Sequence, residues 1–68
     1  MSTTATYTVT GMTCGHCVSS VTEEIQEIAG VEGVQVELET GVVTVSSAEP
    51  VDAAAVRTAV EEAGYQLV

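Results

Sequence analysis

The sequence contains no phenylalanine and no tryptophan, and its only aromatic residues are Tyr7 and Tyr65. The chain is nevertheless apolar enough to fold, since 46% of its 68 residues are hydrophobic. Its interior must therefore be built from valine, isoleucine, leucine, alanine and methionine. A chain of this length is near the lower limit for independent folding, so we expect one small, closely packed domain that spans residues 1–68.

Basic residues are almost absent as well. The sequence has one arginine, Arg57, and no lysine against ten acidic residues, which gives a formal net charge of −9. Nucleic acid and anionic membrane surfaces would repel such a protein, so neither is expected as a partner. A protein partner is expected to carry a basic patch. Most of the acidic residues are spread along the chain, which is typical of solvated faces that keep a protein soluble.

Long hydrophobic runs are also missing. Residues 1–6 have neither the positive charge nor the apolar core of a signal peptide, and no run is long enough to cross a bilayer. We therefore expect a cytoplasmic protein, in a compartment where thiols remain reduced. The two cysteines, Cys14 and Cys17, are expected as thiols or metal ligands rather than as a disulfide.

Alternating and helical patterns follow one another in a regular order. Residues 7–10, 34–39, 43–46 and 65–68 are predicted as strands, with the turn of a hairpin at residues 40–41. Apolar residues recur at helical spacing over residues 15–29 and 52–63, and Gly30 and Gly64 are the expected C-terminal caps. This order predicts an α+β, ferredoxin-like βαββαβ sandwich with two helices on one face of a four-stranded antiparallel sheet. The same topology predicts that Tyr65 returns beside the first strand-to-helix junction.

Residues 11–17, GMTCGHC, place two cysteines at the predicted start of the first helix. Because residues three apart near a helix start share a face, the sulfurs of Cys14 and Cys17 can converge on one ion. The helix dipole favours their thiolate forms. Two thiolates suit Cu(I), which accepts few ligands, whereas a closed Zn(II) site takes four. The sequence has no second CxxC and no histidine pair, so the pattern predicts an open metal site.

An open site also predicts transfer of the metal. A thiolate of a second protein can attack an under-coordinated Cu(I), and either original ligand can then leave, so no free ion is needed. Two open sites can complete each other's coordination, which predicts a copper-bridged homodimer. An enzyme is disfavoured, because the chain has a single histidine, no glycine-rich phosphate loop and little depth for a cleft.

The residues around the cysteines resemble a known family. The GMTCGHC stretch is similar to the GMTCxxC loop of heavy-metal-associated (HMA) domains, and the similarity continues through Gly30-Val31, Val34-Gln35-Val36 and Ala63-Gly64-Tyr65. The resemblance covers nearly the whole chain and is closest to free-standing bacterial copper chaperones of the CopZ type. It implies a ferredoxin-like fold and delivery of Cu(I) to the N-terminal metal-binding domains of a copper-transporting P-type ATPase. It also implies that Cys14 and Cys17 are the metal ligands, that Met12 anchors the loop in the core, and that Tyr65 lies beside the site.

The roles of three residues stay open at this point. His16 is either a solvent-exposed residue at the helix start, or it tunes the acidity of the thiols or supplies a third or bridging ligand. Met12 is either core filler or a thioether ligand. Tyr65 either caps the edge of the core or supports the site without contacting the metal. Together with Gly15 and Gly64, Met12 and Tyr65 are expected to form a shallow apolar patch for docking.

Other functions stay open as well. A metal-binding regulatory domain of a transport ATPase would have the same site chemistry, although a chain that starts at Met1 and ends directly after its last strand favours the free-standing form. A zinc or mercury carrier on the same fold is a further alternative. A thioredoxin-like redox pair is disfavoured, because that motif usually has tryptophan and proline neighbours.

Overall fold

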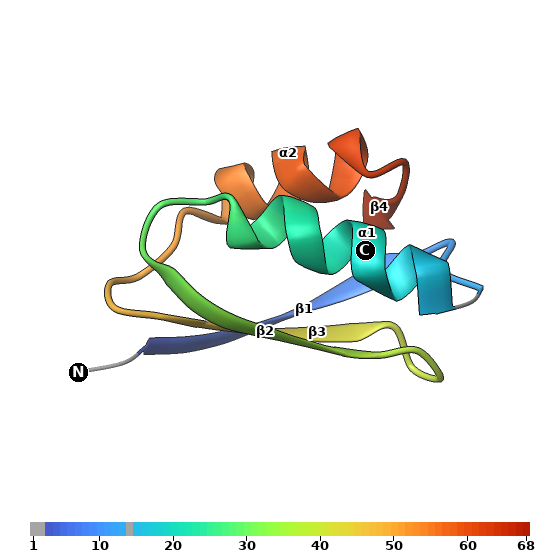
Figure 1. The fold of residues 1–68 in the computed structure, drawn as a ribbon, viewed down its shortest axis with the longest axis horizontal. Helices are drawn as coiled ribbons and strands as arrows, with labels where there is room; N and C mark the ends of the chain where they lie inside the picture. Colours follow the sequence, from blue (N-terminus) through green and yellow to red (C-terminus); the bar gives the residue numbers. More distant parts are fainter. Residues whose placement is uncertain (1–2, 14) are drawn as a thin grey trace.

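The computed structural model describes residues 3–13 and 15–68. Its elements are, in chain order, β1 (Thr3–Thr10), α1 (Gly15–Gln26), β2 (Val31–Glu37), β3 (Val42–Ser47), α2 (Ala53–Glu62) and β4 (Gln66–Leu67). The strands form one sheet in the order β2-β3-β1-β4, and every neighbouring pair is antiparallel. Both helices lie on the same face of this sheet (Figure 1). The element order and the layering confirm the predicted ferredoxin-like βαββαβ sandwich.

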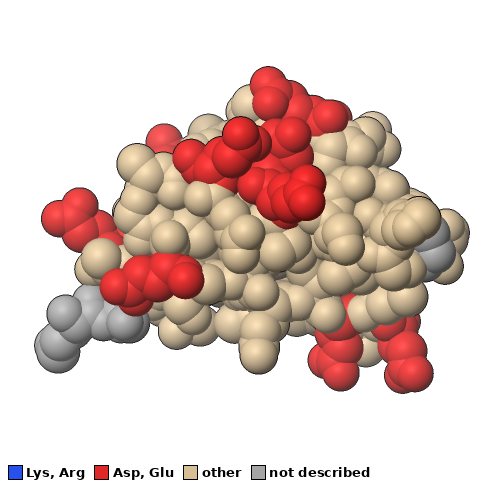
Figure 2. Space-filling model, viewed as in Figure 1, with Lys and Arg blue, Asp and Glu red and all other residues tan. Residues whose placement is uncertain are grey.

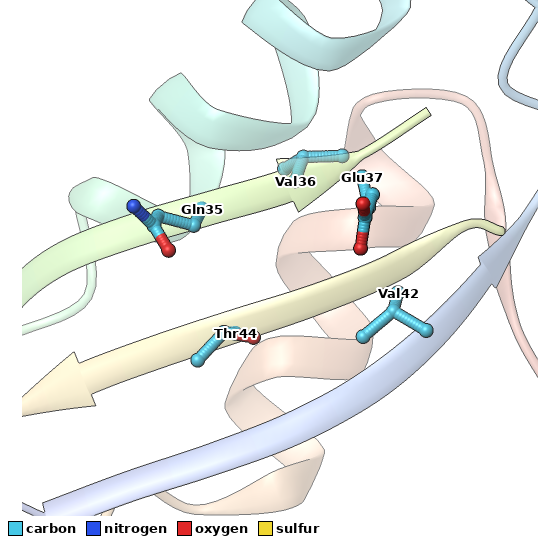
Figure 3. Close-up of a pocket in the computed structure, with 5 residues that line it drawn as sticks. All are labelled: Gln35, Val36, Glu37, Val42 and Thr44. Atoms are coloured by element: carbon cyan, nitrogen blue, oxygen red, sulfur yellow. The ribbon is translucent and has the colours of Figure 1, made fainter. Parts of the chain in front are cut away.

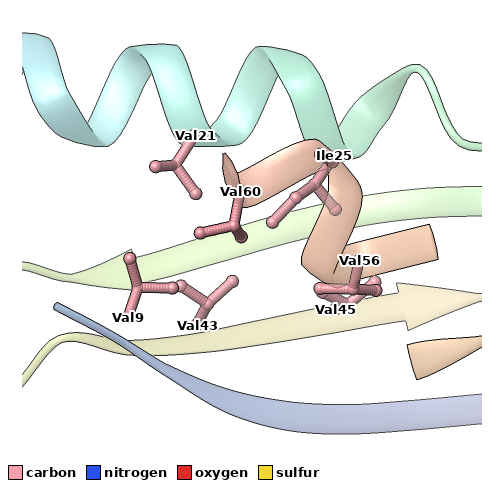
Figure 4. Packing of buried hydrophobic residues seen from close by; sticks show 8 residues of the cluster. Val9, Val21, Ile25, Val43, Val45, Val56 and Val60 are labelled. Carbon is pink, nitrogen blue, oxygen red and sulfur yellow. The ribbon is translucent and has the colours of Figure 1, made fainter. Parts of the chain in front are cut away.

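The hydrophobic core lies between the helices and the sheet (Figure 4). Val21 and Ile25 lie four positions apart on α1, and so share the helix face that points toward the sheet. Val56 and Val60 have the same spacing on α2. The core is aliphatic, as the composition predicts, and its buried members are Val9, Val21, Ile25, Val43, Val45, Val56, Ala59 and Val60.

The helices are shorter than a membrane requires. Within the described part of the chain, no helix is long and apolar enough to cross a bilayer.

α1 ends at Gln26 and not near residue 29, because the backbone beyond Gln26 turns more tightly than an α-helix. The N–H groups of Glu27 and Ile28 donate to the carbonyl oxygens three residues earlier, at 3.3 and 3.0 Å. Gly30 therefore lies directly before β2 and not at the helix cap.

α2 ends in a Schellman motif, which sets where the chain returns to the sheet. The N–H of Gly64 donates to the carbonyl of Glu61, and the N–H of Tyr65 donates to the carbonyl of Val60, both at 3.0 Å. Gly64 has a φ of +97°, as this motif requires at that position. Because Tyr65 is still bonded to the helix, β4 starts one residue later than predicted and has only two residues.

β1 is longer than the alternation in the sequence indicates. It begins at Thr3, and residues 3–6 continue the antiparallel ladder with β3 as far as the pair Thr3↔Ser47. At its other end β1 pairs with β4 through Val9 and Thr10. The last residues of β1 therefore lie between β3 and β4, and they lead directly into the loop that carries the cysteines (Figure 1).

Candidate metal centre

The loop between β1 and α1 carries the predicted metal-binding sequence. α1 begins at Gly15, so Cys17 lies in its first turn. The Cys17 side chain is half-buried, and its Sγ lies 4.0 Å from Oγ1 of Thr13. Cys14 lies outside the described residues. The convergence of the two sulfurs on one ion therefore stays a prediction.

The electrostatic environment of Cys17 comes first from the helix that carries it. The N–H groups at the start of a helix have no intrahelical acceptor and carry a partial positive charge. The first turn of α1 contains no acidic residue that would neutralise this charge. The first acidic residue of the helix is Glu23, more than a turn further on. The local field at the start of α1 therefore favours an anionic sulfur at Cys17.

His16 and Met12 lie in different environments. His16 is exposed on the first turn of α1, as expected for a residue at the helix start. Met12 is half-buried and packs against the hydrophobic core. The position of Met12 is the one expected for a residue that anchors the loop. Whether either side chain contacts a metal stays a prediction.

Tyr65 lies against the loop from the opposite end of the chain. A Cβ atom added at Gly11, where φ is +93°, would lie 3.3 Å from Cδ1 of Tyr65. The residue after Tyr65 is Gln66 of β4. Its carbonyl accepts a hydrogen bond from the Thr10 hydroxyl at 3.3 Å, which ties β4 to the end of β1. The Schellman motif and this pairing together place Tyr65 beside the loop, where the topology predicts it. Its role at the site stays a prediction.

Sequence reasoning included Gly11 and Thr13 only as parts of the GMTCGHC stretch and gave neither residue a role. Thr13 precedes Cys17 by four positions, a spacing at which side chains near a helix meet, and this spacing is a signal that points to it. Gly11 offers no such signal. The residue that would obstruct a side chain at this position is Tyr65, which comes from the other end of the sequence. Its contact follows only from the folded topology.

Acidic side chains gather over the helices (Figure 2), and the surface immediately around the loop, at the right of this view, shows none. Partial burial raises the pKa of Glu24 on α1 above its ordinary value of 4.5. Repulsion from the carboxylates of Glu27 and Glu62 raises it further. Since Glu62 belongs to α2, the acidic surface extends across both helices. The carboxylates that act on Glu24 across this surface are Glu23, Glu27 and Glu62.

A hollow elsewhere on the molecule is unrelated to the loop. It lies where β2 and β3 run side by side, and its lining residues are Gln35, Val36, Glu37, Val42 and Thr44 (Figure 3). None of them carries a thiol or an imidazole. Across residues 3–13 and 15–68, no group of three or more histidine, cysteine, aspartate or glutamate side chains is arranged to hold a metal ion.

The chain is similar to known metal-binding proteins over most of its length. The family described as "Heavy-metal-associated domain" matches residues 6–66. The chain is 41% identical over 63 residues to the copper chaperone CopZ of Bacillus subtilis (strain 168), and the matched region covers 91% of each protein. It is also 41% identical over 59 residues to Copper-transporting ATPase 1 of Rhizobium meliloti (strain 1021), which covers 87% of this chain and 7% of the ATPase. A solved structure described as "CopZ metallochaperone" superposes with a TM-score of 0.91 at 36% identity, and the match covers 97% of this chain and 100% of the other.

Proposed function

Because this chain belongs to the heavy-metal-associated domain family, we propose that it is a cytoplasmic copper chaperone. Residues 1–68 act as one heavy-metal-associated domain, bind Cu(I) through the thiolates of Cys14 and Cys17, and deliver the ion to a copper-transporting P-type ATPase. The observation that carries this proposal is the position of Cys17 in the first turn of α1, directly behind the loop. Relatives that span the same length are named copper chaperones and not enzymes.

Binding of Cu(I) uses the chemistry of the helix start. The uncompensated N–H groups of the first turn of α1 stabilise negative charge on the ligand sulfurs. Cu(I) is a soft ion that thiolates bind well, and two ligands are enough for it. The half-buried position of Cys17 keeps one side of its sulfur within the protein while the loop stays at the surface. An incoming ligand can therefore approach the ion.

Delivery proceeds by ligand exchange. A thiolate of the acceptor joins the two thiolates of this chain on Cu(I), and the three-coordinate intermediate releases Cys14 or Cys17. A further exchange passes the ion to the acceptor. The ion is never released to water, so high affinity and fast transfer are compatible. The oxidation state of copper does not change, and no other reactant is needed.

The remaining residues of the loop have supporting roles in this proposal. Met12 holds the loop on the core, where it already packs. Tyr65, which lies against Gly11, limits how far the loop can move and covers one side of the site. His16 is exposed beside Cys17 and serves as an auxiliary ligand when copper is shared between molecules.

The acceptor is the N-terminal metal-binding domain of a copper-transporting P-type ATPase. The match to a copper-transporting ATPase over 7% of that protein shows that a domain like this one occurs within such a transporter. The docking surface is the apolar patch of Met12, Gly15, Gly64 and Tyr65 around the loop. With a net charge of −9, the chain favours an acceptor with a basic surface. In the absence of an acceptor, copper bridges two copies of this chain through their cysteines.

The same match supports a second candidate function. A metal-binding regulatory domain of a transport ATPase would have the same fold and the same cysteine pair. The two functions differ in whether the chain exchanges copper with a separate ATPase domain. Transfer between two separate proteins therefore distinguishes them.

The experiment that tests the site is a titration of Cu(I) against a strong competing chelator. We expect Cys14→Ser and Cys17→Ser to lose more affinity than the roughly 10–100-fold that follows from loss of an outer hydrogen-bond partner of a ligand. His16→Ala should keep tight binding, and Ser19→Ala, at an exposed position of the same helix, is the control. X-ray absorption of the loaded protein should show two or three sulfur ligands. Four donors supplied by a single molecule, or unchanged affinity without both cysteines, would overturn the proposal.

A transfer experiment tests delivery. The loaded protein is mixed with an isolated ATPase metal-binding domain, and the rate of copper transfer is compared with the rate of copper loss to a chelator. We expect transfer to be faster than spontaneous release, and to slow when the acceptor cysteines are replaced by serine. Transfer at the rate of spontaneous release would rule out ligand exchange between the two proteins.

A further inference from the structure

The first half of β1 is an uncovered edge of the sheet. β1 spans Thr3–Thr10, but β4 pairs only with its last two residues, Val9 and Thr10. The next residue of the C-terminal segment, Val68, donates its N–H to the carbonyl of Thr8 at 2.9 Å. Within the described part of the chain, no strand continues this pairing along residues 3–7. We call residues 3–7 the β1 edge, and Figure 1 shows it extending away from β4.

The backbone groups that the β1 edge presents follow from its pairing with β3. In an antiparallel strand, the N–H and C=O of alternate residues point to opposite sides. Val9 donates its N–H to Gly41 on the β3 side, whereas the carbonyl of Thr8 accepts from Val68 on the β4 side. Thr4 and Thr6 lie four and two residues before Thr8, so their backbone groups point in the same direction as those of Thr8. Their N–H and C=O groups therefore point away from β3, toward the side where no strand follows.

The β1 edge has none of the features that usually prevent strands from pairing. Edge strands are commonly protected by charged residues, proline or a bulge. β1 reads TTATYTVT, with no charge, no proline and no glycine, and its β-branched and aromatic residues favour extended structure. The opposite edge of the sheet differs. β2 carries Glu32 and Glu37 and has a bulge between Val31 and Gly33.

We infer that the β1 edge pairs antiparallel with the β1 edge of a second copy of this chain. A two-fold axis at Ala5 sets Thr4 opposite Thr6 of the second copy, and each such pair exchanges N–H···O=C bonds in both directions. All five residues of the β1 edge of one copy then lie opposite the β1 edge of the second copy, in antiparallel order. The two sheets join into one continuous sheet, with the helices of both copies on the same side.

Charge selects a second copy as the occupant. A chain with a net charge of −9 repels its own copies at most contacts, and an uncharged strand is a place where two copies can approach without bringing carboxylates together. The edge is also self-complementary, because the two residues whose backbone N–H and C=O groups point away from β3, Thr4 and Thr6, are both threonines. The contact is small, so the dimer is weak, with a dissociation constant on the order of 1 mM. Because the remaining charges repel, added salt strengthens it.

This dimer is independent of metal, so the test separates it from the copper-bridged dimer and does not depend on the proposed function. Sedimentation equilibrium is measured on the full chain from micromolar to millimolar concentration, with a reductant and a copper chelator present. The double variant Cys14→Ser/Cys17→Ser is measured in parallel. We expect both proteins to show the same concentration-dependent dimer, with more dimer at 0.5 M than at 0.05 M NaCl, concentrations that span roughly the range in which screening becomes strong.

A charge on the edge should weaken the dimer. Thr6 is exposed on the sheet face without helices, so we expect Thr6→Glu to fold and to reduce the association constant by about tenfold or more. Gln35→Glu is the matched control, because it adds the same charge at an exposed position on the opposite edge strand. It should leave association unchanged except for the small effect of net charge.

Hydrogen exchange tests the register without a variant. The amides of Thr4 and Thr6 should become more protected as the concentration of the unmodified protein rises, while the exchange of the Gln35 amide on the opposite edge strand stays constant. A monomer at all concentrations would overturn the inference. Equal weakening by Thr6→Glu and Gln35→Glu would also overturn it, and so would dimerisation only with copper. In a parallel exchange measurement with an unrelated uncharged peptide, protection of the β1 edge only when the peptide is present would overturn it as well.

Discussion

At the residue scale, Gly41 shows how one backbone position fixes the hairpin against β1. Its N–H donates to the carbonyl of Glu37 and its carbonyl accepts from the N–H of Val9, both at 2.8 Å. A Cβ atom at Gly41 would lie 2.5 Å from the carbonyl oxygen of Val9, and φ is +78°. Gly41→Ala therefore has to move backbone and adopt a strained conformation. We expect it to lower the free energy of unfolding by about 2–4 kcal/mol in urea denaturation.

The control for this substitution is Gly33→Ala. A Cβ atom at Gly33 meets nothing within 4 Å, and this glycine does not have a positive φ. Its replacement should change stability by less than about 0.5 kcal/mol. Equal losses in the two variants would mean that the loss of glycine itself, and not the contact with Val9, determines the effect.

The site is also a matter of single residues, and only its local part was predictable. The pair Cys14 and Cys17, with the helix that starts between them, follows from spacing within one short stretch. The position of Tyr65 beside Gly11 depends on the whole topology, and only the approximate neighbourhood of Tyr65 was predicted. The Thr13 hydroxyl near Cys17 depends on how the loop enters α1, which the sequence pattern leaves undetermined.

At the element scale, the end of α2 connects the stability of a helix to the position of a site residue. Gly64 has a positive φ, but a Cβ atom there would meet nothing within 4 Å. Gly64→Ala therefore costs only the left-handed backbone conformation, about 1 kcal/mol. This corresponds to a fall in Tm of roughly 4–8 °C for a domain of this size.

The Gly64 variant should also disturb the loop. The Schellman motif holds Tyr65, so weakening it should shift the NMR resonances of Gly11, beside which Tyr65 lies, more than those of Glu49, which follows β3 at the opposite end of the sheet. Gly64→Asn is the control, because asparagine tolerates the left-handed conformation better than alanine. If Gly64→Ala lowered Tm without moving the Gly11 resonances, the motif would not determine the position of Tyr65.

The start of α2 allows a second prediction for the same helix. Asp52 is its N-cap, and Oδ1 accepts a hydrogen bond from the N–H of Ala54 at 2.9 Å. Asp52→Ala removes this acceptor and should lower the free energy of unfolding by about 1 kcal/mol in urea. Asp52→Asn keeps an oxygen at this position and should lose only a few tenths of a kcal/mol. A larger loss for asparagine than for alanine would contradict the capping role.

The elements themselves were predictable where their periodicity was strong. The apolar spacing of both helices and the alternation of β3 identified their type correctly, because each buries one face against the same core. Their ends were not predictable from periodicity. β1 extends back to Thr3 only because β3 offers partners for polar residues, and β4 is short because Tyr65 is still bonded to α2.

At the scale of the whole molecule, the net charge of −9 makes stability depend on pH and salt. Glu24 is the group through which this is best measured. Partial burial first, then repulsion from Glu27 and Glu62, raises its pKa above 4.5 in the folded protein. The folded state therefore holds its proton at a pH at which the unfolded chain has lost it. The contribution of Glu24 to stability is therefore most favourable below about its unfolded pKa and is lost as the pH rises through its folded pKa.

Glu24→Gln removes the contribution of Glu24 to this pH dependence and keeps the shape of the side chain. We expect the variant to have a higher Tm than the parent protein at pH 7 and a similar Tm near pH 4, since there Glu24 is largely protonated in both states. The gain at pH 7 should shrink with added salt, because screening shortens from roughly 10 Å at 0.1 M to 3 Å at 1 M and weakens the repulsion. Glu39→Gln, in the hairpin turn, makes the same change in net charge away from the helices. If it raised Tm at pH 7 as much as Glu24→Gln does, total charge would set the stability, and the carboxylates on α1 and α2 would have no special part in it.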